Sequence, residues 1–236
     1  MEKGILTSNS AGNNGPRAST VTSVAPWLLT VAASTTDRRM IDKVVLGNGT
    51  TVVGASVNSF QMTGTSFPLI YGKDATTQCL EFDARKLCYV TSHMAGIDGV
   101  YQSGSLGSIL RVGWDDDLPI FALPATTLSD KEYNMIKSYY MNSTKDPQVN
   151  ILKSEAERDA AADSTIVASF SSRGPNQILP EIIKPDISAP GVAILAAYSP
   201  IASITDNPED KRHVNYSILS GTSMSCPHAT GATAYV

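Results

Sequence analysis

Near its C-terminus the chain carries a run of small residues that strongly limits the structure it can adopt there. The run extends from Gly221 to Gly231 and reads Gly-Thr-Ser-Met-Ser-Cys-Pro-His-Ala-Thr-Gly. Pro227 suits the first turn of a helix, where its missing N–H would have no partner in any case. We therefore expect a helix that begins near Ser223, with the serine hydroxyl among unpaired backbone N–H groups at the positive end of the helix dipole. This position favours a nucleophile that develops negative charge, although a serine there often only caps the helix.

The composition describes a globular protein and argues against several classes of partner. The 236 residues are 42% hydrophobic and 17% charged, and a domain of this size buries roughly three quarters of its unfolded surface. The formal net charge of -4, without a basic cluster, argues against nucleic acid as a partner. The apolar run at residues 25–33 contains Pro26 and is too short to cross a bilayer, so we expect a buried strand there and no membrane partner.

Cysteines and sequons leave the compartment open. The three cysteines are too few to indicate a disulfide framework; they are Cys79, Cys88 and Cys226. Three Asn-x-Ser/Thr sequons matter only if the chain enters the secretory pathway; they begin at Asn48, Asn142 and Asn215. The first residues are polar and do not have the pattern of a secretory signal.

A second constrained stretch lies near the N-terminus, where a short apolar run ends in turn residues. Residues 4–13 favour a buried strand, and the Asn-Asn-Gly-Pro sequence that starts at Asn13 favours a tight turn. Such a sequence is usually no more than a turn. An asparagine side chain can also donate an amide N–H to an oxyanion without exchanging a proton itself.

Further patterns predict a hairpin, several strands and one helix. Gly47-Asn48-Gly49 separates two β-rich runs, which predicts a hairpin loop. Similar runs predict strands at residues 27–33, 105–112, 118–125 and 165–170. A helix is expected after Ser129, with Ser129 and Glu132 forming a capping box. The stripe of this helix that would face the core consists of Tyr133, Ile136, Tyr139 and Tyr140.

Four motifs in a fixed order give these patterns a common interpretation. They are residues 10–16, 170–176, 184–191 and 221–228. Together they resemble the signatures of the subtilisin-like serine peptidases, and most closely those of the plant, cucumisin-like branch. The resemblance implies an α/β fold with a doubly wound, mostly parallel sheet, of which this chain would hold a part that is incomplete at both its N- and C-terminal sides.

In plant members of this family a β-rich, protease-associated domain interrupts the catalytic domain between the asparagine and serine motifs. The resemblance therefore implies catalytic-domain segments at residues 1–69 and 151–236, with the insert at residues 70–150. The insert departs from the family pattern between Cys79 and Cys88, where the intervening segment is shorter than usual. Whether these two cysteines pair stays open, although their spacing can close sterically.

The resemblance also assigns roles to individual residues. Ser223 would be the nucleophile that forms an acyl-enzyme, and Asn13 would donate to the oxyanion hole. Ala11 and Gly12 would belong to one wall of the substrate pocket. The substrates would be proteins or peptides, cleaved outside the cell in the cell wall or apoplast, and no cofactor or metal is implied.

The Asp and His of the catalytic triad precede the asparagine motif in this family, so we expect both to be absent from this chain. None of the three histidines is a natural replacement. His228 lies about 500° around the helix from Ser223 and should face away from it, His213 follows a charged loop, and His93 falls in the insert. We thus expect that the chain is related to serine endopeptidases and that its 236 residues alone are inactive. The alternative is a catalytically inactive fragment or degenerate copy with at most a peptide- or protein-binding role. An esterase is disfavoured because no Gly-x-Ser-x-Gly elbow surrounds Ser223.

Overall fold

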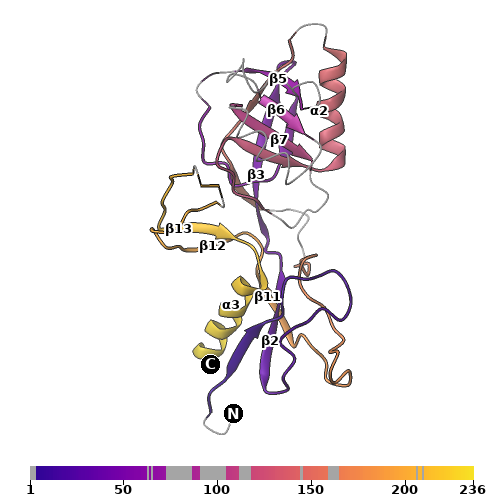
Figure 1. The fold of residues 1–236 in the computed structure, drawn as a ribbon, viewed down its shortest axis with the longest axis vertical. Coiled ribbons are helices and arrows are strands. Elements are labelled where there is room, and N and C mark those ends of the chain that lie inside the picture. Colours follow the sequence, from indigo (N-terminus) through magenta and orange to yellow (C-terminus); the bar gives the residue numbers. More distant parts are fainter. Residues whose placement is uncertain are drawn as a thin grey trace.

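The protein divides into two lobes that are arranged along one long axis (Figure 1). The structure is a computed structural model that describes residues 4–62, 64, 66–72, 87–90, 105–111, 118–143, 146–158, 165–205, 207–208 and 210–236. One lobe contains the C-terminal helix α3 and a small parallel sheet, and the other contains α2 and a larger sheet (Figure 1). A hairpin, β12–β13, projects to the side between them (Figure 1).

The small sheet is entirely parallel and carries the N-terminal and C-terminal motifs. Its strand order is β1-β2-β11, made of β1 (Thr7–Ser10), β2 (Leu28–Ser34) and β11 (Ile187–Pro190). Helix α3 (Thr222–Tyr235) packs against this sheet, with Ala229 contacting Val31 and Ala189 in a buried cluster. The prediction of a mixed α/β fold with parallel strands is confirmed, and the run at residues 27–33 does form a buried strand.

The large sheet has eight strands and mixes parallel with antiparallel pairing. Its order is β10 (Glu155–Arg158), β3 (Arg38–Leu46), β9 (Gln148–Ile151), β5 (Phe67–Tyr71), β6 (Leu87–Val90), β7 (Gly107–Arg111) and β8 (Ala125–Leu128), with β4 (Thr51–Gly54) beside β3. Strands β5 to β8 are parallel, and the other pairs are antiparallel. The sheet therefore includes β3 and β4, which precede residue 70, and β10, which follows residue 150.

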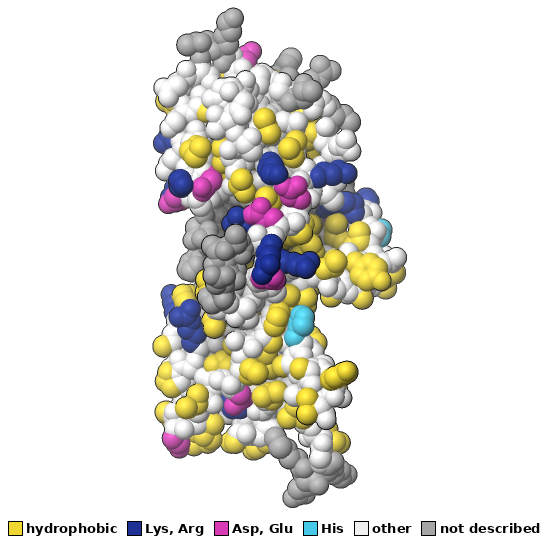
Figure 2. Space-filling view, turned by 180° about the vertical axis from the view of Figure 1, so that it is seen from behind, with side chains coloured by type: hydrophobic (Ala, Val, Ile, Leu, Met, Phe, Trp, Pro, Cys, Tyr) yellow, Lys and Arg dark blue, Asp and Glu magenta, His cyan; other side chains and the backbone are white. Residues whose placement is uncertain are grey.

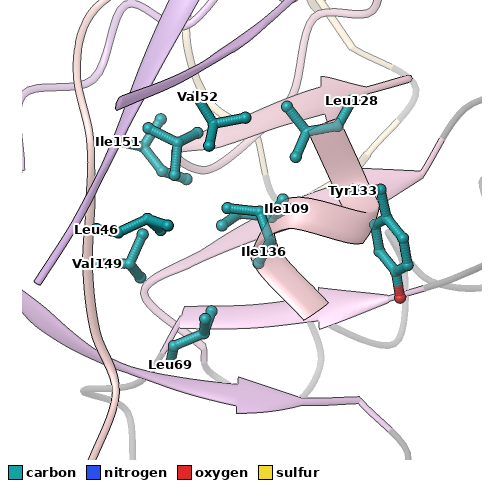
Figure 3. Packing of buried hydrophobic residues seen from close by; sticks show 10 residues of the cluster. Leu46, Val52, Leu69, Ile109, Leu128, Tyr133, Ile136, Val149 and Ile151 are labelled. Atoms are coloured by element: carbon teal, nitrogen blue, oxygen red, sulfur yellow. The ribbon is translucent and has the colours of Figure 1, made fainter. Parts of the chain in front are cut away.

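Helix α2 (Asp130–Asn142) covers this sheet and closes its core. Ile136 is fully buried against Ile109 and Val149, and Figure 3 shows these side chains pointing toward one another. Tyr133 is also buried, while Tyr139 and Tyr140 pack partly against the same cluster. The predicted helix and its apolar stripe are thus confirmed. Ser129 stands at the N-cap as expected, but its hydroxyl bonds to the Glu132 carboxylate instead of capping a backbone N–H, so the capping-box bond was wrong.

Two strand predictions were wrong, and the strand expected within residues 4–13 forms as β1 but is exposed or half-buried instead of buried. Residues 118–124 are irregular, and the strand begins only at Ala125, because Pro119 and Pro124 lack the N–H that a ladder requires. At residues 165–170 only a single bridge joins Val167 to Ser34 before a turn begins, in which the Ser171 N–H donates to the Ala168 carbonyl at 3.0 Å. The predicted hairpin around Asn48 is confirmed, since Val44 pairs with Val52 across it.

The hairpin of β12 (Ile194–Ala197) and β13 (Tyr216–Leu219) exposes much of its apolar surface. Leu195 and Tyr216 are each 67% exposed. From behind, hydrophobic side chains gather on this projecting part of the molecule (Figure 2). Strand β13 matters for the site because it ends at Leu219, just before the turn that leads into α3.

Candidate active site

The asparagine and serine motifs, which are more than 200 positions apart in the sequence, meet at one end of the parallel sheet. Asn13 follows β1, and its side-chain Oδ1 accepts hydrogen bonds from the Thr222 backbone N–H at 2.9 Å and the Thr222 hydroxyl at 2.8 Å. These two bonds orient the amide, so its Nδ2 faces the turn at Gly221. The structure thereby brings the predicted residues Asn13 and Ser223 together.

Two N–H donors flank an open position beside Gly221. A Cβ built on Gly221 would lie 3.4 Å from Asn13 Nδ2 and 3.7 Å from the Ser223 backbone nitrogen. Gly221 has a φ of +156°, which an L side chain rarely adopts, so glycine is favoured here and no side chain fills the space between these two donors. Ser223 is the second residue of α3, where backbone N–H groups have no helical partner. The two N–H groups can therefore donate hydrogen bonds from two directions to one acceptor atom.

The Ser223 side chain is exposed at the start of α3. Among the residues that the structure describes, its hydroxyl has no hydrogen-bond partner. Pro227 lies in the second turn of the helix and not in the first as predicted, because the helix already begins at Thr222. Pro227 consequently has no N–H to offer the Ser223 carbonyl, the acceptor four residues before it.

Gly191 allows the serine turn to approach the sheet closely. Its N–H donates to the Ser34 carbonyl at 2.9 Å, and its carbonyl accepts the Gly221 N–H at 2.8 Å. A Cβ on Gly191 would overlap the Ser225 hydroxyl and lie 2.8 Å from Ala33 Cβ. The motif at residues 184–191 therefore supports the start of α3, a role that its sequence alone did not reveal.

The same motif holds β2 through an ion pair in which the lysine is buried and the aspartate is partly exposed. The Lys184 side chain is 1% exposed, and its Nζ lies 2.6 Å from both Asp186 Oδ2 and the Leu28 carbonyl. Asp186 Oδ2 also accepts the Thr30 N–H at 2.7 Å. A charge buried this deeply requires such partners, so Lys184 and Asp186 fix the strand that lies beneath the site.

Ala11 and Gly12 connect the asparagine turn to its surroundings. Ala11 is fully buried, packs in the cluster that also holds Val21, and donates its N–H to the Val31 carbonyl at 2.9 Å. Gly12 donates its N–H to the Thr222 hydroxyl at 3.2 Å and accepts the Ser172 N–H at 2.9 Å. The Ala11 side chain thus lies in the core, and Gly12 lies beside the serine motif.

Neither of the two histidines that the structure describes, His213 and His228, is hydrogen-bonded to Ser223. His228 is exposed, and its Nδ1 lies 2.8 Å from the Met224 carbonyl one turn earlier in α3. His213 is exposed ahead of β13. His93 lies outside the described residues, as does Cys79, while only the backbone of Cys88 is described.

The described residues contain neither a candidate metal site nor a membrane-spanning helix. Within the described ranges, no group of three or more His, Cys, Asp or Glu side chains could hold a metal ion. The helices of the described part are too short or too polar to cross a membrane.

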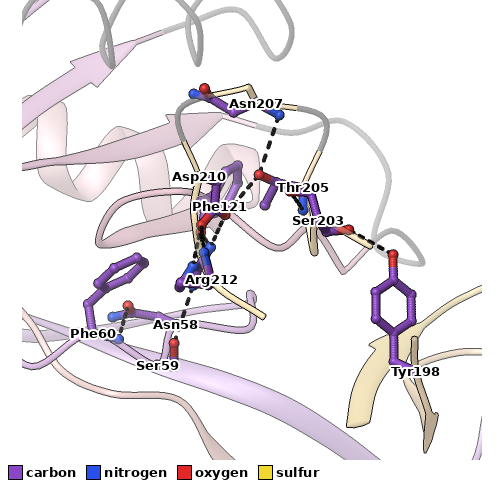
Figure 4. A network of polar contacts seen from close by, with 10 residues as sticks. All are labelled: Asn58, Ser59, Phe60, Phe121, Tyr198, Ser203, Thr205, Asn207, Asp210 and Arg212. Carbon is purple, nitrogen blue, oxygen red and sulfur yellow. Dashed lines mark hydrogen bonds and ion pairs between the residues drawn. The ribbon is translucent and has the colours of Figure 1, made fainter. Parts of the chain in front are cut away.

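Arg212 joins the large-sheet lobe to the segment that leads into the serine motif (Figure 4). Its guanidinium lies 2.7 Å from Asp210 Oδ2, donates to the Phe121 carbonyl and stacks 4.6 Å from the centre of the Phe60 ring. Arg212 lowers the pKa of Asp210 to about 2 by hydrogen bonding to its carboxylate. Since Arg212 precedes β13 by a few residues, this junction links Phe60 and Phe121 to the strand that ends just before Gly221.

Comparison of the whole sequence with known protein families and proteins tests the resemblance that the four motifs indicated. The profile of the subtilase family matches residues 1–236. The chain belongs to the subtilase family. Two Arabidopsis thaliana proteins illustrate the relationship: subtilisin-like protease SBT4.6 is 47% identical over 249 residues, and subtilisin-like protease SBT4.13 is 48% identical over 250. Both matches cover 100% of this chain, which spans 33% and 34% of the two relatives, so the resemblance to plant subtilases is confirmed.

Proposed function

We propose that this chain forms the nucleophile and oxyanion-binding part of a subtilisin-like serine endopeptidase that acts on proteins or peptides. The observation that carries the proposal is the pair of N–H donors, from Asn13 and Ser223, that flank the open position beside Gly221. Ser223 Oγ attacks the carbonyl carbon of the scissile peptide, and the oxygen that becomes negative occupies this position. Collapse of the tetrahedral intermediate expels the amine and leaves an acyl-enzyme on Ser223, which water then hydrolyses.

Serine attack on an amide also requires a general base, which must take the proton from the hydroxyl. We propose that this base is a histidine, oriented by an aspartate, and that neither belongs to these 236 residues. The positions of His228 and His213, both exposed and neither bonded to Ser223, support this view. On this proposal the 236-residue chain alone binds peptides at most, and a binding role without hydrolysis is the second candidate function.

A fluorophosphonate probe separates these possibilities because it labels only an activated serine. The chain alone is compared with a fusion in which the preceding part of subtilisin-like protease SBT4.13 is placed ahead of it. We expect the probe to label the fusion and not the chain alone. Ser223→Ala should abolish labelling of the fusion. The control Ser199→Ala, which alters an exposed serine on the β12–β13 loop, should leave labelling unchanged. Stoichiometric labelling of Ser223 in the chain alone would refute the proposal that the general base lies outside these 236 residues. A fusion that folds and binds peptide without labelling would favour the binding role.

The oxyanion role of Asn13 is tested in the same fusion. Asn13→Ala should slow labelling and peptide cleavage by about 100- to 1,000-fold in kcat, the range observed when the corresponding donor is removed from subtilisin itself. The substitution should change KM little, because the donor acts on charge that exists only in the transition state. An equal loss with Asn14→Ala, whose side chain has no such position in the described structure, would contradict the assignment.

We also propose that the large sheet is the protease-associated insert and that the protein acts outside the cell, as expected for this family. Because β3, β4 and β10 belong to that sheet, the proposed insert extends beyond residues 70–150, to about Asp37 and Arg158. Limited proteolysis tests the boundaries: cleavage confined to the connections near these two residues supports them, and a stable core fragment that starts at residue 70 contradicts them.

A further inference from the structure

A groove far from Ser223 lies between the β3–β4 hairpin and helix α2. Its volume is about 640 Å³, within the range of ordinary small-ligand sites, roughly 300–1,000 Å³. One face of α2 supplies its floor through residues at helical spacing, including Lys131, Met135 and Ser138. Asn48 and Thr50, from the hairpin loop, line the opposite side.

Asn48 begins the sequon Asn48-Gly49-Thr50 and lies exposed at the tip of this hairpin. Its side-chain Oδ1 accepts the Thr50 backbone N–H at 3.0 Å, so the amide oxygen is held against the loop and Nδ2 is left on the other side. Gly49 has a φ of +85°, and a Cβ built there would meet no atom within 4 Å. The loop is therefore both tightly turned and surrounded by open space.

We propose that Asn48 is N-glycosylated and that the innermost sugars of its glycan lie in the groove between the hairpin and α2. The proposal rests on the extracellular location proposed above, because the modification requires the secretory pathway. In the transfer step Asn48 Nδ2 attacks the anomeric carbon of a lipid diphosphate-linked oligosaccharide. A C–N bond forms, the C–O bond to the diphosphate breaks, the lipid diphosphate leaves, and the amide nitrogen loses one proton to a base of the transferase.

The lining of the groove matches the chemistry of a sugar ring, which has a polar rim and an apolar face. Asn134 and Ser138 offer amide and hydroxyl groups to the rim, and Met135 with Tyr139 offers apolar surface to the face. Met135 is 41% exposed. A glycan anchored at the groove's own rim would cover this side chain at little additional cost in entropy, since its attachment point is already fixed.

The sequon at Asn215 offers a contrast within the same chain. Its hydroxyl residue, Ser217, is 8% exposed in β13, and the Asn215 carbonyl accepts the Tyr198 N–H at 2.8 Å. A transferase must reach both the asparagine and the hydroxyl of a sequon, so the folded hairpin β12–β13 disfavours modification there. The Asn48 loop presents no such obstacle.

Occupancy is tested by secreting the full chain from eukaryotic cells behind a heterologous signal peptide. Peptide mapping after treatment with a peptide-N-glycosidase should find Asn48 converted to Asp in most molecules. The glycan should be lost in Asn48→Gln and in Thr50→Ala, which keeps the asparagine, and retained in Asn134→Gln, which alters a groove asparagine outside any sequon. An unmodified Asn48 in the secreted chain would overturn the proposal.

The location of the glycan in the groove is tested by hydroxyl-radical footprinting of two methionines on α2. The glycan on Asn48 should lower the oxidation rate of Met135 by about three-fold or more relative to Asn48→Gln. This variant lacks the Asn48 glycan and leaves unchanged any glycan on Asn142, the sequon asparagine that also lines the groove. Met141, which is 69% exposed and does not line the groove, should be unchanged. Equal oxidation rates of Met135 with and without the Asn48 glycan would refute the proposal that the glycan lies in the groove. Because the signal peptide is supplied, either failure is independent of the Ser223 labelling test.

Discussion

The close approach of α3 to the sheet at Gly191 makes Gly191→Ala the sharpest test of how the site is supported. The new Cβ would overlap Ser225 Oγ and lie 2.8 Å from Ala33 Cβ and 2.9 Å from the Gly221 carbonyl oxygen. Real Cβ atoms do not approach other atoms this closely, and Ala33 Cβ and the Gly221 backbone have no rotamer with which to withdraw. The first turn of α3 must therefore shift away from β2, and overpacking of this kind destabilises by about 1–3 kcal/mol.

The assay is urea unfolding followed by tryptophan fluorescence and far-ultraviolet circular dichroism, with Gly231→Ala as the matched control. Gly231 lies in the same helix, and a Cβ there would meet nothing within 4 Å. We expect Gly191→Ala to lower the free energy of unfolding by about 1–3 kcal/mol and Gly231→Ala to raise it by about 0.5–1 kcal/mol, because alanine is the better helix former.

A second substitution identifies the clash itself. Ser225 is fully buried, and its hydroxyl has no hydrogen-bond partner among the described residues. Ser225→Ala should thus be neutral or slightly stabilising alone, and combined with Gly191→Ala it should recover part of the lost stability. Strictly additive effects, or an unchanged midpoint for Gly191→Ala, would refute the reasoning that Gly191 is required for the approach of α3.

The remaining predictions concern the Arg212 junction. Arg212→Ala leaves the Asp210 side chain, which is 3% exposed, without its cation and should destabilise by about 3–5 kcal/mol in thermal or urea unfolding. The control Arg111→Ala removes an exposed pair with Asp130 and should change stability far less, because water screens exposed charges; equal losses would contradict a special role for the junction. Because the folded pKa of Asp210, about 2, lies below its unfolded value, its contribution is present above pH 4 or so and is lost as pH falls toward 2. Asp210→Asn should therefore flatten the acid limb of a stability-versus-pH curve, and an unaltered limb would count against this linkage. Hydrogen exchange should report faster opening of β13 in Arg212→Ala than in Arg111→Ala, and equal rates would show that the junction does not reach the serine motif.

Local patterns predicted several elements correctly because short-range interactions dominate them. The hairpin at Asn48 follows from its glycine turn between β-rich arms, and α2 follows from the spacing of Tyr133 and Ile136. The prediction of a strand at residues 118–125 was wrong for residues 118–124. This segment is rich in apolar residues, but its two prolines interrupt the hydrogen-bond ladder. Ser129 was correctly placed at the N-cap, yet its hydroxyl found a carboxylate partner that a one-dimensional pattern does not reveal.

The sequence by itself determined the family and the residue types of the candidate site. Ser223 behind a glycine and Asn13 in a turn could be read from the chain, since each depends on neighbours within a few positions. Only the tertiary structure decided how they cooperate: Thr222 orients the Asn13 amide, Gly221 keeps the position between the donors open, and Gly191 seats the turn on the sheet. These contacts join residues from distant parts of the chain, so they exist only once the sheet has brought the segments together.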